Sequence, residues 1–517
     1  MGFERPQQVR SRIAPSAAAF AVVFGILSTS LFAQDEAPEP AKKDRVVELL
    51  GKLKAKGIIT QDEYDELAGN TPAARVEARA ERRKQAVRDA VDAQKAEAAQ
   101  ERYNGRWNNG ITFAAPDNRN TFAIGGRIHA DYRYFDENTA PSTFDVRRAY
   151  LTLSGKWNEW LTWDLTGDFA RTGIALDVAW ANAAWSDALQ VRAGQFKMPF
   201  SLEELGSSRY LDFQERSIVN RLVPGRERGI MLHGAPFLGT TYAVALSNGA
   251  GRNNNEAAPG ADAPDVIARA TVNFAEILGQ QAKAVYHLGV AGSVGTLPSG
   301  GPALGNTATE ARGYAFFVPT VFTGSNTDRQ RTAVEAAVAY GPLKLQSEWV
   351  RANFKGTSAN RVGYDKGIDS YYVRLMWLIT GERYAETYRN GIFGQRIVPI
   401  QNYTPGGSAW GAWELGLQFS SFDASDIPLT GGTALAAGDS LTGTGTLQSV
   451  ATGGTLANRA TAMTLGLKWI WTPNFKLYLN YIDTKFDNPI RFTPTGAAAA
   501  FTSDRERAIT MRAAFDF

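Results

Sequence analysis

The last nine residues alternate strictly between apolar and more polar side chains. The apolar set consists of Ile509, Met511, Ala513, Phe515 and Phe517. The intervening set consists of Thr510, Arg512, Ala514 and Asp516. Because successive side chains of a β-strand point to opposite faces, this alternation predicts a strand with one mostly apolar face. A strand of this kind fits either a soluble β-sandwich or a transmembrane β-barrel.

Residues 1–33 have the composition of a secretory signal peptide. Three arginines, at positions 5, 10 and 12, precede an apolar run over residues 14–32. We expect cleavage after Ala33, followed by an acidic, proline-containing linker over residues 34–42. A signal-anchor helix is the alternative, although the apolar run is near the short end for crossing a bilayer.

The remaining sequence restricts how the mature chain can enter a membrane. Beyond residue 33, no uncharged apolar run is long enough for a membrane helix. Since only helices and closed barrels satisfy every backbone hydrogen bond inside a bilayer, a membrane-embedded mature chain must form a barrel. The formal net charge of +3 gives no reason to expect a nucleic-acid partner, and the absence of cysteine fits an exported protein without disulfides.

Residues 43–103 are rich in Lys, Arg, Glu and Ala, which predicts helices. Thr60 and Glu63 have the spacing of a capping box between two short helices, so we expect a helical hairpin first. A charged helix over about residues 72–100 follows, with small apolar residues at heptad-like intervals. Two interpretations of this helix stay open, a periplasmic coiled coil and a solvated single helix.

From about Trp107 onward, aromatic and β-branched segments alternate with loop residues, which predicts strands. Residues 122–135 form the first good strand, with charges on one face and aromatic residues on the other. Over residues 122–517 we count about seventeen such segments; because single-chain bacterial barrels have even strand numbers, we expect sixteen strands, with eighteen as the alternative. The predicted fold is an all-β transmembrane barrel over residues 107–517, wide enough for an aqueous channel and preceded by the α-helical segment.

Strand periodicity places several arginines on the polar, lumen-facing side of this barrel. They are Arg127, Arg133, Arg148 and Arg192. Charged side chains inside a membrane protein usually mark a solute path, so we expect these arginines to face the channel.

One predicted loop, residues 199–229, differs from the others because it combines apolar anchors with five arginines. The arginines are Arg209, Arg216, Arg221, Arg226 and Arg228. We expect this loop to fold into the barrel and narrow the pore, where fixed positive charge favours anions. The loop contains five carboxylates as well, so pairing of the arginines within the loop is the alternative.

The sequence gives no sign of an enzyme, a cofactor or a metal site. Its three histidines, His129, His233 and His287, lie far apart in strand-like segments without a metal-ligand companion at short spacing. Neighbouring glycine pairs lie in low-complexity loops, so they do not indicate a nucleotide-binding turn.

The segment GQFKMPFSLEEL at residues 194–205, with ERS at 215–217 and VPGR at 223–226, resembles the phosphate-selective porin O and P family. RRA at 147–149 resembles an earlier block of the same family. The resemblance implies a sixteen-stranded outer-membrane porin, usually trimeric, whose constriction passes anions. It also implies that Lys197, Arg216 and Arg226 are family-type residues of the constriction.

We therefore expect passive diffusion of small solutes, with anions such as phosphate as the preferred class. A weakly selective general porin is one alternative, and a barrel anchor that tethers the outer membrane to the cell wall is another. The expected location is the outer membrane of a Gram-negative-type bacterium, with residues 43–103 in the periplasm. The expected partners are small anionic solutes, outer-membrane lipid, two further copies in a homotrimer and peptidoglycan, the last through residues 43–103.

Overall fold

The computed structural model describes residues 45–69, 72–100, 104–107, 110–170, 173–254, 264–297, 306–317, 326–357, 363–427, 456–493 and 499–517. The expected signal peptide (1–33) and linker (34–42) lie outside the described residues. The chain divides into two units, residues 1–100 and 101–517.

Three helices make up the described part of the first unit: α1 (Arg45–Ala55), α2 (Gln61–Gly69) and α3 (Pro72–Gln100). The predicted capping box at the start of α2 is present. The Thr60 N–H donates to Glu63 Oε2 over 2.8 Å, and the Glu63 N–H donates to Thr60 Oγ1 over 3.2 Å. The hydrogen bonds from Thr60 lower the pKa of Glu63, because they stabilise its ionised form. No helix among the described residues has the length and apolar character of a membrane span.

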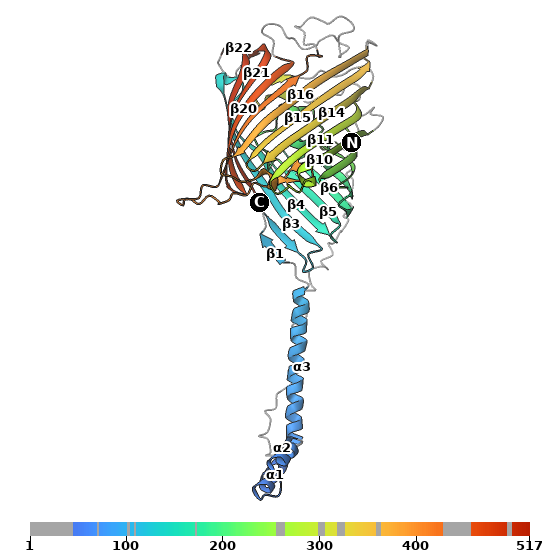
Figure 1. Cartoon of the computed structure of the whole chain (residues 1–517), viewed down its shortest axis with the longest axis vertical. Helices are drawn as coiled ribbons and strands as arrows, with labels where there is room; N and C mark the ends of the chain where they lie inside the picture. Colours follow the sequence, from blue (N-terminus) through green and yellow to red (C-terminus); the bar gives the residue numbers. More distant parts are fainter. Residues whose placement is uncertain are drawn as a thin grey trace, which may run out of the picture. The chain divides into compact units, whose positions relative to one another are not determined.

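Sixteen antiparallel strands of the described second unit close into a barrel (Figure 1). The last strand pairs with the first, from Ala508 opposite Phe135 to Asp516 opposite Arg127. The predicted barrel of sixteen strands is confirmed. The alternative of eighteen is wrong, because the two additional strands form a hairpin that pairs with the amino-terminal end of the first barrel strand without entering the ring.

The barrel strands are β3 (Thr121–Phe135), β4 (Thr143–Trp157), β5 (Leu161–Asp168), β6 (Ala175–Ser186), β7 (Leu189–Lys197), β8 (Arg226–Gly234), β9 (Thr240–Ser247), β10 (Asp265–Asn273), β11 (Ala284–Leu297), β14 (Thr327–Tyr340), β15 (Leu343–Thr357), β16 (Gly363–Leu378), β19 (Ala412–Asp423), β20 (Arg459–Thr472), β21 (Phe475–Phe492) and β22 (Phe501–Asp516). The hairpin is β1 (Asn104–Trp107) with β2 (Ile111–Ala114). The short elements are η1 (Asp136–Asn138), α4 (Leu202–Leu205), η2 (Ile218–Arg221), α5 (Phe274–Ile277), β12 (Thr307–Ala308), β13 (Ala315–Phe317), η3 (Tyr384–Thr387), β17 (Tyr388–Arg389) and β18 (Ile392–Phe393).

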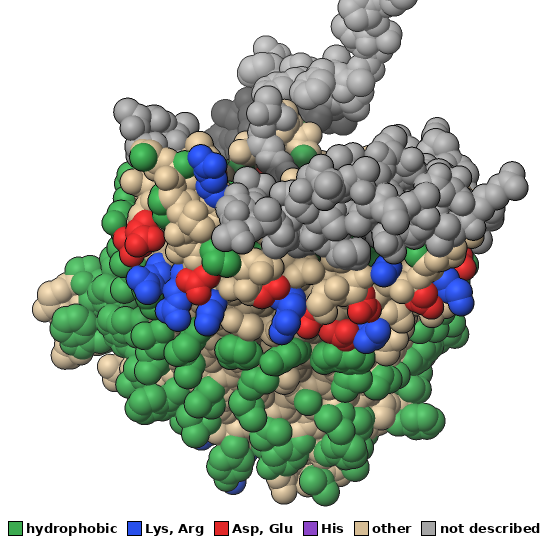
Figure 2. Space-filling view, turned by 90° about the horizontal axis from the view of Figure 1, so that it is seen from above, with side chains coloured by type: hydrophobic (Ala, Val, Ile, Leu, Met, Phe, Trp, Pro, Cys, Tyr) green, Lys and Arg blue, Asp and Glu red, His purple; other side chains and the backbone are tan. Residues whose placement is uncertain are grey.

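The barrel wall is apolar outside and polar inside. In β22, Met511 is 46% exposed on the outer face whereas Arg512 is 2% exposed. Figure 2 shows a wide hydrophobic surface bordered by a row of Lys, Arg, Asp and Glu side chains. This is the arrangement of a lipid-facing band that ends at the headgroup level, and it excludes the soluble sandwich.

The connections at the two ends of the barrel differ in length. At one end, turns such as residues 158–160 and 473–474 are short. The exception at this end is the connection between β16 and β19 (residues 379–411), which we call the β16–β19 connection. Its Tyr384 is 1% exposed and donates a hydrogen bond to Glu414 Oε1 over 2.6 Å, so this part of the connection packs against the inner wall.

At the other end, the connection between β7 and β8 (residues 198–225) turns into the barrel, and we call it the inward loop. The largest buried apolar cluster lies there: Phe196, Met198, Phe200, Ile218, Val219 and Leu222 belong to it together with Phe316 and Phe317 of β13. The predicted loop of residues 199–229 extended too far, because Arg226 and Arg228 are already part of β8.

Candidate functional site

The wall strand β15 anchors the start of the inward loop. Ser201 caps the short helix α4 by accepting a hydrogen bond from the Glu204 N–H over 3.1 Å. The buried Glu348 carboxylate of β15 accepts from the N–H groups of Leu202, over 3.1 Å, and of Glu203, over 2.7 Å. The carboxylate therefore satisfies backbone donors that a helix start leaves without partners.

A second anchor joins two acidic residues of the loop to Arg374 of β16. Glu203 accepts from the Ser217 hydroxyl over 2.7 Å and forms an ion pair with Arg374. Arg374 Nη1 also lies 3.0 Å from Asp212 Oδ2. Because Arg374 is almost fully buried, these contacts hold the start and the middle of the loop to one position on the wall.

The third anchor is a group of four arginines around the Glu215 carboxylate. Arg147 Nε and Arg512 Nη2 lie 2.8 Å from its Oε1 atom, and Arg133 and Arg148 lie 3.9 Å from its oxygens. Burial by itself raises the pKa of Glu215, but the arginines hold that pKa well below its usual value. Arg133 and Arg148 therefore face the lumen as strand periodicity indicated, within a paired cluster.

Glu204 gathers the residues that the family resemblance singled out. Arg216 Nε lies 3.1 Å from Glu204 Oε2, and Arg216 also donates to the Gly206 carbonyl over 2.8 Å. Arg226 lies 3.7 Å and Lys197 4.0 Å from Glu204 Oε1. These contacts give Arg216 a role in holding the loop's own backbone.

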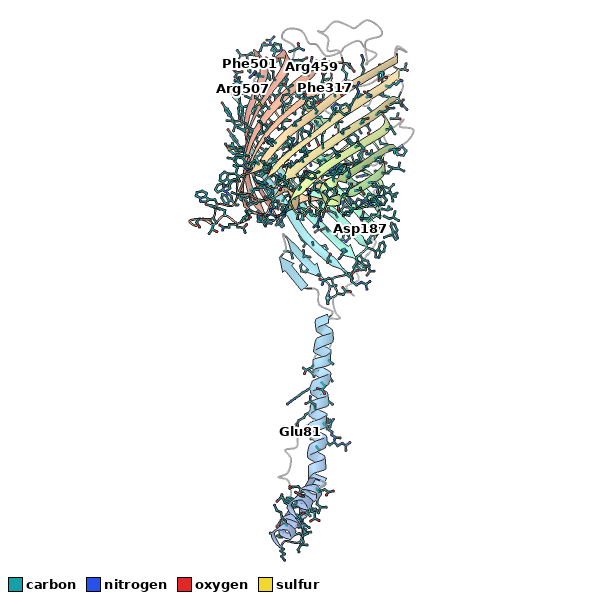
Figure 3. All side chains as sticks on the ribbon, in the orientation of Figure 1. Glu81, Asp187, Phe317, Arg459, Phe501 and Arg507 are labelled. Atoms are coloured by element: carbon teal, nitrogen blue, oxygen red, sulfur yellow. The ribbon has the colours of Figure 1, made fainter. Side chains whose placement is uncertain are left out.

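The inward loop leaves a lumen cavity of about 650 Å³, lined by side chains from β3 through β10, by the loop and by residues 390 and 392. Six cationic side chains line it: Arg127, Arg192, Lys197, Arg209, Arg226 and Arg269. Three carboxylates also line it: Asp164, Asp177 and Asp187. Figure 3 shows Asp187 near the end of the barrel with the short connections, so the cavity extends toward that end.

The six cations of the cavity differ in their partners. Three form ion pairs: Lys197 with Glu204, Arg226 with Asp177 and Arg269 with Glu335. The other three form no ion pair among the described residues, and they are Arg127, Arg192 and Arg209.

Neutral groups hold each of these three arginines. Arg127 donates to the hydroxyls of Ser207 and Ser208, over 3.1 and 2.7 Å. Arg209 donates to the Gly126 carbonyl over 3.2 Å. The Arg192 guanidinium lies 4.2 Å from the centroid of the Trp180 ring. Since these partners carry no charge, all three guanidiniums keep their positive charge toward the cavity.

Five of the ten sequence-predicted site residues do not line this cavity. Arg133 and Arg148 surround Glu215, and Arg216 binds the loop. Arg221 is exposed in η2, and Arg228 Nε donates to Gln195 over 3.3 Å.

Three lysines outside the sequence-predicted site project into the lumen near Arg209 and Tyr384: Lys344, Lys468 and Lys476. Lys344 pairs with Asp212 over 2.6 Å, Lys468 pairs with Glu414, and Lys476 pairs with Asp516 over 3.4 Å. The alternation around Lys344, between Leu343 and Leu345, was enough to place its side chain on the inner face.

The histidines have separate structural partners. His287 Nδ1 lies 2.7 Å from the Tyr388 hydroxyl, and His233 Nε2 lies 2.7 Å from Asn182 Oδ1. Among the residues that the structure describes, no group of His, Asp and Glu side chains could hold a metal ion.

The chain matches one known protein family over most of its length. The sequence model of the family described as "Phosphate-selective porin O and P" matches residues 122–517. Porin O of Pseudomonas aeruginosa is 24% identical over 412 residues, which are 73% of this chain and 86% of that protein.

Among solved structures, the anion-selective porin from Comamonas acidovorans has 13% sequence identity and a TM-score of 0.44, over 77% of this chain and 100% of that one. The outer-membrane channel DcaP of Acinetobacter baumannii has 11% identity and a TM-score of 0.45, over 77% of this chain and 97% of that one. Because the family match covers most of its length, the chain belongs to the phosphate-selective porin O and P family, and it is an outer-membrane channel and not an enzyme.

Proposed function

We propose that this porin passes small anions by passive diffusion through the lumen cavity. The observation that carries the proposal is the set of three cavity arginines without an ion pair among the described residues, Arg127, Arg192 and Arg209. Fixed positive charge in a narrow space with low-dielectric walls attracts anions and replaces part of their hydration shell.

The carboxylates of the same cavity limit how tightly an anion binds. Asp164, Asp177 and Asp187 line the cavity together with the cations. Conduction requires that a solute enters favourably and also leaves, so a mixed lining supports rapid passage better than a purely cationic one. We therefore expect weak anion preference and no energy coupling.

Phosphate is one candidate solute, because the family description names phosphate selectivity. A weakly selective general porin is the alternative. Lys197, Arg216 and Arg226, the family-type residues, all contact Glu204, so the anion path in this chain depends mainly on the other arginines of the cavity.

Reversal potentials in planar bilayers test this proposal. Under a KCl gradient, the sign of the wild-type reversal potential should show that chloride permeates better than potassium. Replacing chloride by phosphate on one side should then show whether phosphate is preferred. Cation preference in the wild type would contradict the anion proposal, and equal permeability of chloride and phosphate would favour the weakly selective porin.

We also propose that residues 1–33 are a signal peptide and that residues 43–103 act in the periplasm, where they associate with other copies or contact peptidoglycan. Apolar side chains of the helical segment support this, since Leu49, Ile58, Val87 and Val91 are between 41% and 64% exposed in the single chain. Groups of exposed apolar side chains mark a partner surface more often than single scattered ones do.

Deletion of residues 43–103 separates the pore from the tether. Single-channel conductance should stay largely intact if the barrel alone forms the pore. Loss of envelope integrity without a change in solute uptake would favour the tether as the main role. Chemical cross-linking of the full chain and of the deletion variant tests the proposed homotrimer, and a barrel that remains trimeric after deletion would exclude the coiled coil as its cause.

A further inference from the structure

The lumen cavity has an apolar side that inorganic ions do not need. Val178 and Trp180 of β6, Leu205 of the inward loop and Ile392 of the β16–β19 connection line it, and each side chain is half-buried. These residues come from three separate elements. Together they give the cavity an apolar surface. A small hydrated ion does not cover this surface, so it stays in contact with water when such an ion is bound.

Trp180 lies beside the cationic residues of the cavity. The Arg192 guanidinium lies 4.2 Å from its ring centroid. On the neighbouring strands, Arg192 is the register partner of Met231, and Trp180 is the register partner of Asp164. The same part of the wall therefore offers an aromatic face, a thioether and a guanidinium without an ion pair.

The charged and apolar sides belong to one cavity of about 650 Å³. Small-molecule sites commonly measure about 300–1,000 Å³, and they combine a largely apolar lining with a few polar groups that orient the ligand. Arginine suits a planar carboxylate because its N–H groups can bind both carboxylate oxygens. Arg127, Arg192 and Arg209 are the cations available for this contact.

We propose that the cavity takes organic anions that join a carboxylate to an aromatic ring, in preference to small inorganic anions. The carboxylate contacts Arg127, Arg192 or Arg209, and the ring lies against Trp180, Val178 and Ile392. This inference rests on the proposed anion pathway and names its solute class. It predicts that the apolar body of the solute adds affinity that acetate or phosphate does not gain.

Block of the chloride current tests the solute class. Benzoate, acetate and inorganic phosphate are added separately to the wild-type channel in planar bilayers. Benzoate should reach half-block at a concentration lower than that of acetate or phosphate. In the Trp180→Ala variant, the half-blocking concentration of benzoate should rise about two- to tenfold, the range expected for the loss of one aromatic contact.

Two further variants keep the result interpretable. Trp185→Ala removes a tryptophan from the same strand at a position that is 66% exposed. Benzoate should block this variant at the same concentration as the wild type. Trp180→Phe keeps an aromatic ring at the cavity and should recover most of the benzoate block, which shows that a defect of the alanine variant does not arise from misfolding alone.

The measurements distinguish a failure of the proposed solute class from a failure of the anion pathway. A channel that prefers chloride over potassium but is blocked equally by benzoate and acetate, or more strongly by phosphate, overturns this inference and leaves the anion pathway standing. Equal benzoate block in Trp180→Ala and Trp185→Ala also overturns it. A wild-type channel that prefers potassium overturns both the anion pathway and the solute class.

Discussion

At the scale of residues, ion pairing decides which arginines keep charge available to a solute. Glu215 contacts four arginines, whereas Arg127, Arg192 and Arg209 have neutral partners. Strand periodicity predicted which side chains face the lumen. It could not predict the contacts of Arg133 and Arg148 with Glu215, because Glu215 comes from a loop whose path is set by tertiary packing.

The Glu215→Gln variant tests the arginine group. Removing one partner of a buried charge cluster leaves like charges close together, so we expect a loss of about 3–5 kcal/mol in the free energy of unfolding. Denaturant unfolding of the barrel in lipid vesicles measures it. Asp369→Asn is the matched control, since it breaks an exposed pair with Arg351 that should contribute at most about 1 kcal/mol. Equal losses in the two variants would show that Glu215 does not anchor the loop.

Glu310 gives the barrel a pH dependence. Its buried carboxylate accepts from the hydroxyls of Ser420, over 2.6 Å, and Thr464, over 2.8 Å, and from the Ile218 N–H over 3.1 Å. Burial raises the pKa of Glu310 more than these hydrogen bonds lower it. Because the folded-state pKa lies above the unfolded value, the stabilisation is present at low pH and is lost as pH rises through the folded-state pKa.

We therefore expect the free energy of unfolding of the wild type to fall, relative to that of Glu310→Gln, as the pH rises from the ordinary carboxylate pKa toward neutrality. Denaturant midpoints of both proteins, measured across this range, provide the comparison. Parallel pH profiles would contradict the assignment of this dependence to Glu310.

At the scale of elements, the inward loop needs a flat patch on the opposite wall. Gly416 of β19 and Gly466 of β20 are register partners, and the Phe213 ring of the loop packs over both. A Cβ atom would lie 2.9 Å from this ring at Gly416 and 2.7 Å at Gly466. The sequence shows both glycines but not their pairing, which depends on the register of two strands.

The Gly466→Ala variant should displace Phe213 and loosen the inward loop. Overpacking of this kind costs about 1–3 kcal/mol and should appear as larger current fluctuations in single-channel records. Gly292→Ala is the control, because a Cβ atom there meets its nearest neighbour, the Arg331 carbonyl oxygen, at 3.8 Å. Quiet, wild-type-like records from Gly466→Ala would contradict this role of the glycine pair.

The entry of the β16–β19 connection into the barrel was not predictable from the sequence. The apolar anchors of the inward loop indicated that it would fold into the barrel. The β16–β19 connection enters through Tyr384 and Tyr388, whose hydroxyls contact Glu414 and His287 of different strands. No local pattern marks such long-range contacts, so the sequence alone gave no reason to distinguish this connection from a surface turn.

At the scale of the whole molecule, the inward loop and the β16–β19 connection divide the lumen unequally. The inward loop is fixed to the wall through Glu348 of β15, Arg374 of β16 and Arg512 of β22, while the cavity lies along β3 through β10. Alternation along the chain gave about seventeen strands, and the even strand number of bacterial barrels then led to sixteen, with eighteen as the alternative. The side of the lumen that stays open was not predictable, because it follows from the packing of two loops.

The reversal potential of a variant with Arg127, Arg192 and Arg209 all changed to glutamine shows whether these three arginines set the anion preference of the pore. Under a KCl gradient, the wild type should prefer chloride, and the triple variant should lose most of that preference because its cavity keeps the carboxylates Asp164 and Asp177. Arg221→Gln is the control, since Arg221 does not line the cavity, and it should behave like the wild type. Unchanged chloride preference in the triple variant would mean that other groups of the pore select the anion.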